Sequence, residues 1–336
     1  MLITEIVRFL NKLGFFEISL KILGRSKIIS VLVHDVVDYS EHETLVSVDA
    51  VSATSLEEII RYSSRLCEIK SLEEAIELFL NGKNQSKCIV SFTFDDGYIG
   101  QVKYALPILL EYHVKATFYP LYYNIENREM FWWDEVNYIV KHYSTKTPES
   151  ISKNSEIIGF LKKTTLTERR RFLENLREKA NISVPKKLVD RVIMKPNDIR
   201  YLVTKGMFIG GHSLSHPSLP KIPLEEARSE ILYSLMKARE YSRKQNIFTF
   251  AYPFGEYNKK IAEMVRNLGF AAAVTTMSRA SKLTLENMFK LGRLILSAGP
   301  ELNHLVSFKY MASNMYYNYR TLKLKLRNLW SRKTKL

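Results

Sequence analysis

The sequence predicts an α/β protein built as a distorted (β/α) barrel, with a helical insertion and with helices at the ends of the chain. Short apolar, β-prone runs alternate with amphipathic helical segments along most of the 336 residues. This alternation is typical of parallel strands joined by right-handed crossovers, and the number of repeats is enough to close a barrel. The hydrophobic content is 46%, so a chain of this length can bury a full core.

The first predicted elements are a strand and two helices. An apolar, β-branched run reaches His34 and predicts the first strand. Two helices are expected next, because Ser55 with Glu58 and Ser71 with Glu74 have the spacing of capping boxes. A second strand is predicted at residues 88–96, followed by a helix and a strand that reach residue 123.

Residues 131–195 are more polar and mostly helical in pattern, and we interpret them as an insertion rather than as a separate domain. Within them, the adjacent aromatic residues Trp132 and Trp133 could line a binding groove or pack in the core, so we assign neither a role. The alternation resumes after residue 206 and continues through a long amphipathic helix. The later strands are predicted within residues 246–255, 271–276 and 291–296.

The two ends of the chain differ from its body. Residues 1–25 have the pattern of an amphipathic helix, which could pack on the domain's own core or lie on a membrane surface. Residues 301–336 are a basic tail, in which no Asp or Glu occurs from Leu302 onwards. This tail is either a solvated charged end or an amphipathic segment that lies on anionic lipid.

The overall charge favours anionic partners. Lys and Arg number 50 against 35 Asp and Glu, a formal net charge of +15 at pH 7. No nucleic-acid-binding motif is recognisable, so we expect no nucleic acid partner. No apolar run is long enough for a signal peptide or a membrane span. We therefore expect a cytoplasmic protein, peripheral at the inner membrane face if the tail binds lipid.

Cysteine usage gives a further expectation. Cys67 and Cys88 are the only two cysteines. A chain of this length with two cysteines is not a disulfide scaffold, and we expect both to be buried free thiols.

Asp95 and Asp96 end the apolar run of residues 88–96 and carry adjacent negative charges. Asp-Gly is a common turn dipeptide, so a hairpin is the simple alternative. However, the residues after Gly97 have a helical pattern and do not form a return strand. A divalent metal would explain the pair, because one carboxylate would bind the cation while the other stayed ionised to take a proton from water.

His212 and His216 are four residues apart, so both imidazoles can face one ion. Two imidazoles and one carboxylate are a common ligand set for Zn²⁺ or a similar divalent ion with open positions. The alternative is a pair of surface or capping histidines. Gly210 and Gly211 before the pair and Pro217 after it indicate a fixed loop.

The candidate site residues share one position in the predicted fold: each directly follows a predicted strand. In a barrel of parallel strands the carboxyl ends converge on one rim, where catalytic groups are carried. We therefore expect His34, the two aspartates, the two histidines and residues 252–254 to meet in one pocket.

The motifs "TFDDGY", "GGHSLSHPSL" and "FAYPFG", in this order, resemble those of polysaccharide deacetylases, the NodB-homology or carbohydrate esterase family 4, over roughly residues 28–300. The resemblance implies that residues 26–300 form a catalytic domain that removes an N-acetyl group from a sugar with a divalent metal, with Zn²⁺ the expected ion. It also implies that Asp95 is the general base. The implied metal ligands are Asp96, His212 and His216.

Two departures from the common pattern change the assignment of the remaining roles. Many members carry an Arg two residues before the Pro of the "PY" segment, but Ala251 stands here. Arg293 resembles the Arg of an "LPRI" segment in a branch with this gap, which implies that it holds the base. There is no late "LxxH" segment. His34 matches the early "YH" of circularly permuted members such as poly-N-acetylglucosamine deacetylases, where a tyrosine replaces Val33, and this implies that His34 is the general acid.

The resemblance also places Tyr252 and Phe254 beside the substrate, with the backbone N–H of Phe254 as an oxyanion donor. A carboxylate that orients His34 is not identifiable, and Asp35 and Asp38 are candidates only by closeness in sequence. The expected substrate is an N-acetylated amino sugar in a polysaccharide, an oligosaccharide or a lipid-linked saccharide. Two alternatives remain: hydrolysis of another non-peptide C–N amide, and a non-catalytic member that binds glycan or membrane.

Overall fold

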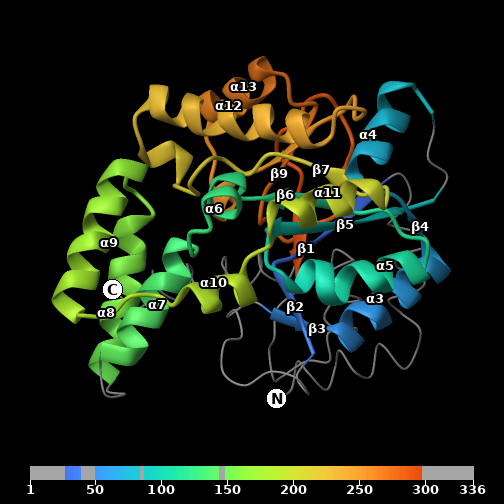
Figure 1. Ribbon diagram of the computed structural model, residues 1–336. Helices are drawn as coiled ribbons and strands as arrows, with labels where there is room; N and C mark the ends of the chain where they lie inside the picture. The colour runs from blue at the N-terminus through green and yellow to red at the C-terminus, as the bar shows by residue number, and fades with distance from the viewer. Residues whose placement is uncertain (1–26, 39–49, 84–86, 144–147, 297–336) are drawn as a thin grey trace, which may run out of the picture.

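The computed structural model describes residues 27–38, 50–83, 87–143 and 148–296, and side chains within residues 148–153 are not described (Figure 1). The expected N-terminal helix of residues 1–25 and the basic tail of residues 301–336 lie outside this part of the chain. No helix in the described part is long and apolar enough to cross a membrane.

Parallel strands form a distorted barrel. In the main sheet, β1 (Lys27–Val33) lies between β5 (Ile89–Asp96) and β11 (Arg293–Ile295), and all of these pairings are parallel. Next to β5 come β6 (Thr117–Pro120) and then β7 (Phe208–Ile209). A separate parallel pair joins β8 (Thr249–Ala251) to β9 (Ala272–Val274).

Two isolated β-bridges connect these sheets into a ring. The bridge Gly211↔Phe250 joins the chain after β7 to β8, and the bridge Val274↔Leu291 joins β9 to the chain before β11. Because single bridges replace full ladders at these two places, the barrel is closed but irregular. The fold class predicted from the alternation of strands and helices is therefore confirmed.

Short strands complete the sheet arrangement. β4 (Glu68–Ile69) pairs with β5, and β10 (Ser281–Lys282) pairs antiparallel with β1. β2 (Asp35–Val37) and β3 (Ala50–Ser52) form a small parallel pair. Nearly every residue of β1 and β5 is buried, as expected for parallel strands that are covered on both faces.

Helices cover the outside of the barrel. α3 (Ala53–Leu66) and α5 (Leu106–Glu111) lie on one side, and α12 (Leu224–Tyr241) and α13 (Lys259–Leu268) lie together on the other (Figure 1). The capping box predicted for Ser71 and Glu74 is present at the start of α4 (Leu72–Leu80). The box predicted for Ser55 is wrong, because α3 begins three residues earlier and its N-cap is Ser52, whose side chain accepts from the N–H of Ser55.

Residues 122–204, between β6 and β7, form a run of helices. Three of them, α7 (Trp132–Tyr143), α8 (Pro148–Leu161) and α9 (Leu166–Ala180), stand apart from the barrel helices (Figure 1). They have their own buried cluster of Trp132, Val136, Leu161 and Leu173, against which Phe254 packs. The helices in this run are α6 (Tyr122–Asn127), α7 (Trp132–Tyr143), α8 (Pro148–Leu161), α9 (Leu166–Ala180), α10 (Lys186–Val192) and α11 (Pro196–Thr204).

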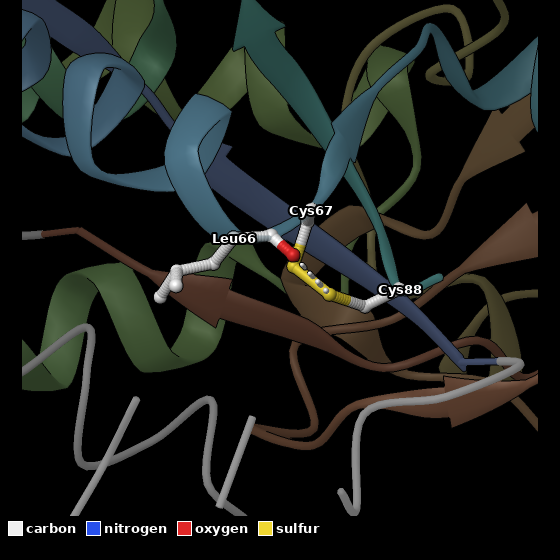
Figure 2. Close-up of a disulfide and its surroundings, with 3 residues drawn as sticks. All are labelled: Leu66, Cys67 and Cys88. Atoms are coloured by element: carbon white, nitrogen blue, oxygen red, sulfur yellow. Dashed lines mark hydrogen bonds between the residues drawn. A yellow bond between two sulfur atoms is a disulfide. The ribbon is translucent and has the colours of Figure 1, made fainter. Parts of the chain in front are cut away.

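Cys67 and Cys88 form a disulfide, so the expectation of free thiols is wrong (Figure 2). Both are buried, with Cα atoms 4.9 Å apart. Cys67 ends α3, and Cys88 directly precedes β5, where its carbonyl accepts from the N–H of Glu68 in β4. The pairing of β4 with β5 therefore brings the two sulfurs together. Disulfides are typical of oxidising compartments, so this bridge does not favour the cytoplasmic location expected from the sequence, which stays a prediction.

Glu73 links two strands of the barrel at their amino ends. Its carboxylate accepts from the hydroxyl of Thr117, which begins β6, at 2.5 Å and from that of Thr249, which begins β8, at 2.6 Å. The hydroxyl of Tyr119 is hydrogen-bonded to the hydroxyl of Thr249 at 2.7 Å. Because no ladder joins β6 to β8, this side chain links two parts of the barrel wall. Burial raises the pKa of Glu73 to about 7, although both hydroxyl bonds oppose the shift.

Removing the disulfide should destabilise the protein. We expect Cys67→Ala/Cys88→Ala to lower the free energy of unfolding by about 3 kcal/mol, because the bridge closes a loop across 21 residues and restricts the unfolded chain. Denaturant titration with and without reductant measures this. The double variant, in which reductant should change nothing, is the control. A wild-type protein equally stable under both conditions would contradict the prediction.

Glu73 should make stability fall as pH rises. Its folded pKa of about 7 exceeds the ordinary value of 4.5, so the folded state binds more protons than the unfolded state between these pH values. The free energy of unfolding should therefore decrease from about pH 4.5 to pH 7 by roughly 3 kcal/mol and level off above. Glu73→Gln should lose this contribution, as seen by comparing urea unfolding of both proteins at pH 5 and pH 8. Parallel pH dependences would count against it.

Candidate active site

The predicted site residues follow the carboxyl ends of the barrel strands, with one exception. Asp95 and Asp96 end β5, and the pairing of Val33 with Phe94 places His34 beside Asp95. His212 and His216 occupy the loop after β7, and residues 252–254 follow β8. Arg293 instead begins β11, next to β1.

Asp95 and Arg293 form a buried, two-pronged ion pair. The two terminal nitrogens of Arg293 donate to the two carboxylate oxygens of Asp95, each at 2.7 Å. The guanidinium is fully buried and also donates from Nε to the carbonyl of Thr275 at 3.0 Å. Burial alone would raise the pKa of Asp95, but the charges of Arg293 and His212 outweigh it and hold this pKa below its ordinary value. Asp95 is therefore ionised near neutral pH.

Asp96, His212 and His216 form a group able to hold a metal ion, since their ligand atoms lie within 4.8 Å of one another. Asp96 Oδ1 lies 3.4 Å from His212 Nε2 and 3.7 Å from His216 Nε2. This oxygen is buried and has no hydrogen-bond partner among the described residues. A carboxylate and two imidazoles with open positions suit Zn²⁺. The orphaned oxygen and the donor set both fit a divalent cation.

Hydrogen bonding orients the ring of His212, and burial favours the neutral form of His216. His212 Nδ1 lies 2.7 Å from the carbonyl of Ala251. A carbonyl only accepts, so Nδ1 carries the proton and leaves Nε2 free toward Asp96. Burial lowers the pKa of His212, but the charges of Asp95 and Asp96 outweigh it and raise this pKa. Burial and the nearby His212 lower the pKa of His216 well below its ordinary value, which favours the neutral form that a metal requires.

Backbone strain is concentrated at this rim. Four non-glycine residues of the site have left-handed backbone angles, which cost free energy and persist only where surrounding contacts impose them. They are Asp96 (φ 71°), Ser213 (φ 67°), His216 (φ 59°) and Phe254 (φ 57°).

His34 is held beside Asp95 by a residue that the sequence analysis missed. The side-chain amide of the fully buried Gln101 donates to the backbone carbonyls of both His34 and Asp95, each at 2.5 Å. A polar side chain within the apolar segment of residues 99–110 was the only sequence signal for Gln101.

No carboxylate is bonded to Nδ1 of His34, which is buried and unpartnered among the described residues. Asp35, one of the two candidates for orienting His34, accepts instead from the N–H of Val36 at 2.9 Å. Burial raises the pKa of Asp35 to about 7.

The structure separates Tyr252 from Phe254. Phe254 lies at the site, with its ring 4.4 Å from that of His216, and its N–H is in the first turn of a short 3-10 helix, where amides have no intrahelical acceptor. The side chain of Tyr252 is fully buried and donates to the carbonyl of Phe289 at 3.1 Å. The side chain of Tyr252 thus continues the buried pattern of β8, and the expected place of Tyr252 beside the substrate stays a prediction.

Aromatic residues of α7 form a wall beside the histidines. The ring of Trp133 lies 4.8 Å from that of His216, and its Nε1 donates to the hydroxyl of Tyr98 at 2.9 Å. Tyr98 in turn donates to Asp134 at 2.8 Å. Trp132 is buried and contacts Phe254 edge to face. Both tryptophans thus pack in the wall of the site.

Residues 82–273 match the family model described as polysaccharide deacetylase. This match covers more than half of the chain, and the protein belongs to that family. It is a hydrolase that acts on carbon–nitrogen bonds other than peptide bonds. A comparison with curated protein sequences finds no match.

Several solved structures share the fold at low sequence identity. The deacetylase PplD of Streptococcus pyogenes, solved with acetate, is 18% identical with a TM-score of 0.57, and the match covers 84% of this chain and 98% of PplD. A de-N-acetylase of Aggregatibacter actinomycetemcomitans is 16% identical with a TM-score of 0.54, covering 84% and 99% of the two chains. IcaB of Ammonifex degensii is 15% identical with a TM-score of 0.53, covering 85% and 97%.

The pairing of Asp95 with Arg293 should be measurable as a coupling energy. We expect Arg293→Met to lower the free energy of unfolding by about 3–5 kcal/mol, because it leaves a buried carboxylate unpaired. Asp95→Asn/Arg293→Met should recover part of this loss, since the unpaired charge is then removed. Urea titration of both single variants and the double variant completes the cycle. Simple additivity of the two single effects would disprove the coupling.

Proposed function

We propose that this protein is a metal-dependent deacetylase that removes the N-acetyl group from an N-acetylated amino sugar and releases acetate. The observation that carries the proposal is the grouping of Asp96, His212 and His216 beside the buried, ionised Asp95. Family membership supports the reaction class. The de-N-acetylase with a similar fold is consistent with it.

Zn²⁺ is the ion that the ligand set favours, held by Asp96, His212 and His216. When bound, such an ion polarises a carbonyl oxygen and makes a water molecule more acidic. The chain's own residues position these groups: the Ala251 carbonyl fixes the ring of His212, and the left-handed backbone at Asp96 and His216 presents their side chains at the rim.

Asp95 acts as the general base. Arg293 keeps it ionised and fixes its plane, and each carboxylate oxygen retains a lone pair after bonding to Arg293. Asp95 takes the proton from water as the water oxygen attacks the acetyl carbon. The backbone N–H of Phe254 donates to the oxygen that becomes negative. His34, in its protonated form, gives a proton to the sugar nitrogen as the C–N bond breaks, which yields acetate and a free amine.

The surroundings of the site favour a saccharide. The aromatic wall made by Trp133 and Phe254 gives flat apolar surface next to the metal ligands, of the kind that sugar rings pack against. We propose that the substrate is an N-acetylated amino sugar in a polysaccharide, an oligosaccharide or a lipid-linked saccharide.

The two neighbouring aspartates give the decisive test. Asp96→Asn should lose Zn²⁺ binding and activity together, because it removes a ligand. Asp95→Asn should retain Zn²⁺ while turnover falls by roughly 10²–10⁴-fold, as expected for loss of a general base. Acetate release from N-acetylated hexosamine oligomers measures turnover, and titration calorimetry measures the metal.

Urea titration of both variants shows whether each is folded under the assay conditions, which matters because Asp95→Asn also leaves the buried Arg293 unpaired. Equal loss of metal in both variants would overturn the assigned roles. Absence of acetate release by the zinc-loaded wild type across these oligomers would overturn the proposed substrate class.

A further inference from the structure

Two buried, oppositely charged residues from different helices hold the loop that carries the histidines. Glu230 of α12 accepts from the N–H of Leu214 at 2.8 Å and from the N–H of Ser215 at 2.7 Å. Its other carboxylate oxygen accepts from the hydroxyl of Ser215 at 2.6 Å. Glu230 is only 5% exposed.

Arg169 of α9 holds the same loop from the other side. Its Nη1 donates to the carbonyl of Ser215, its Nη2 to the carbonyl of Thr164 at 2.8 Å, and its Nε to that of Leu161 at 3.3 Å. The guanidinium lies 4.9 Å over the ring of Trp132 and is 2% exposed as a residue. The N–H, the carbonyl and the hydroxyl of Ser215 are therefore all bound by these two charged side chains.

The burial of these charges is costly, which argues that they have a purpose in the site. Burial lowers the pKa of Arg169 to about 10 and raises that of Glu230. Each charge is stabilised in part by the other across Ser215. Buried ion pairs are weak devices for stability, because apolar residues of similar volume serve as well. Arg169 and Glu230 form no direct ion pair in the described part of the chain and instead both bond to Ser215, which indicates that they act on the geometry of this residue.

The loop requires such an external hold. Ser213 and His216 are both left-handed, and within the loop the N–H of His216 is bonded to the Ser213 hydroxyl at 3.0 Å. A strained backbone persists when surrounding contacts determine it. Ser215 directly precedes His216, so a shift of Ser215 moves the imidazole relative to Asp96 and His212.

The insertion contributes further contacts to the same place. The N–H of Ser218 donates to the carbonyl of Lys162 at 2.7 Å, and the ammonium of Lys162 lies 4.1 Å over the ring of Phe254. The segment between α8 and α9 thus contacts the chain on both sides of the site.

We propose that Arg169 and Glu230 form a charge clamp on Ser215 that sets the position of His216, so that helix α9 of the insertion is a working part of the metal site. Both are positioning residues, because neither touches the reacting atoms. The inference rests on the proposed function, since it takes Asp96, His212 and His216 as metal ligands.

The test compares neighbouring arginines of one helix in the full-length protein. Arg169→Met should weaken Zn²⁺ binding by roughly 10–100-fold, the range typical for residues that orient metal ligands. Arg170→Met is the matched control, because Arg170 is exposed and pairs with Glu129 at 2.5 Å away from the loop. This control should bind Zn²⁺ like the wild type. Competition with a chromophoric chelator measures the affinities.

A spectroscopic readout separates positioning from general destabilisation. Co²⁺ bound to Arg169→Met should show an altered visible absorption spectrum, because His216 is displaced from the ion, while Arg170→Met should show the wild-type spectrum. Arg169→Lys restores the charge without the planar fork and should recover only part of the affinity.

Glu230→Gln keeps the size of the side chain and removes its charge. If Arg169→Met does not fold, the Zn²⁺ affinity and Co²⁺ spectrum of Glu230→Gln test the charge clamp instead. If folded Arg169→Met, or Glu230→Gln in its place, binds Zn²⁺ as tightly as the wild type and gives the wild-type Co²⁺ spectrum, the charge clamp is overturned. The proposed function would not be affected by that result. A wild-type protein that binds neither ion would overturn the proposed function itself.

Discussion

Asp95 and Asp96 are buried next to each other at the end of β5, and this concentration of negative charge determines what the rest of the rim must provide. Adjacent carboxylates in an environment of low polarity repel each other, and their burial is costly in free energy unless each has its own compensating partner. Arg293, 198 residues further along the chain, forms an ion pair with Asp95. Asp96 lies beside two histidines, and the proposed cation would compensate its charge. Both sets of partners come from elements far from β5 in the sequence, so the closed barrel is needed to bring them together.

The two ends of the barrel are used differently. At the carboxyl ends of the strands, buried charges and strained backbone meet in the site. At the amino ends, Glu73 ties β6 to β8, and the disulfide ties the end of α3 to the start of β5. This division agrees with the general behaviour of parallel barrels, in which one face supplies chemistry and the other supplies stability. The two isolated bridges make such ties useful, because they leave parts of the wall without full ladders.

The helices between β6 and β7 contribute residues to the wall of the site and to the histidine loop. α7 places Trp133 against His216, and the charge clamp of Arg169 and Glu230 connects α9 and α12 through a single serine. Helices on opposite sides of the histidine loop are therefore coupled through its backbone. We infer that these contacts hold the left-handed residues Ser213 and His216 in place.

Local sequence determined much of the site. The aspartate pair after an apolar strand, the two histidines four residues apart and the capping box at Ser71 are readable because their partners are close in the chain. The alternation of strands and helices likewise determined the barrel. Only the tertiary structure decided the pairing of the two cysteines, the inward turn of Tyr252, and the roles of Gln101, Arg169 and Glu230. Their partners lie on other elements, and contacts between distant segments leave no periodic signal in the sequence.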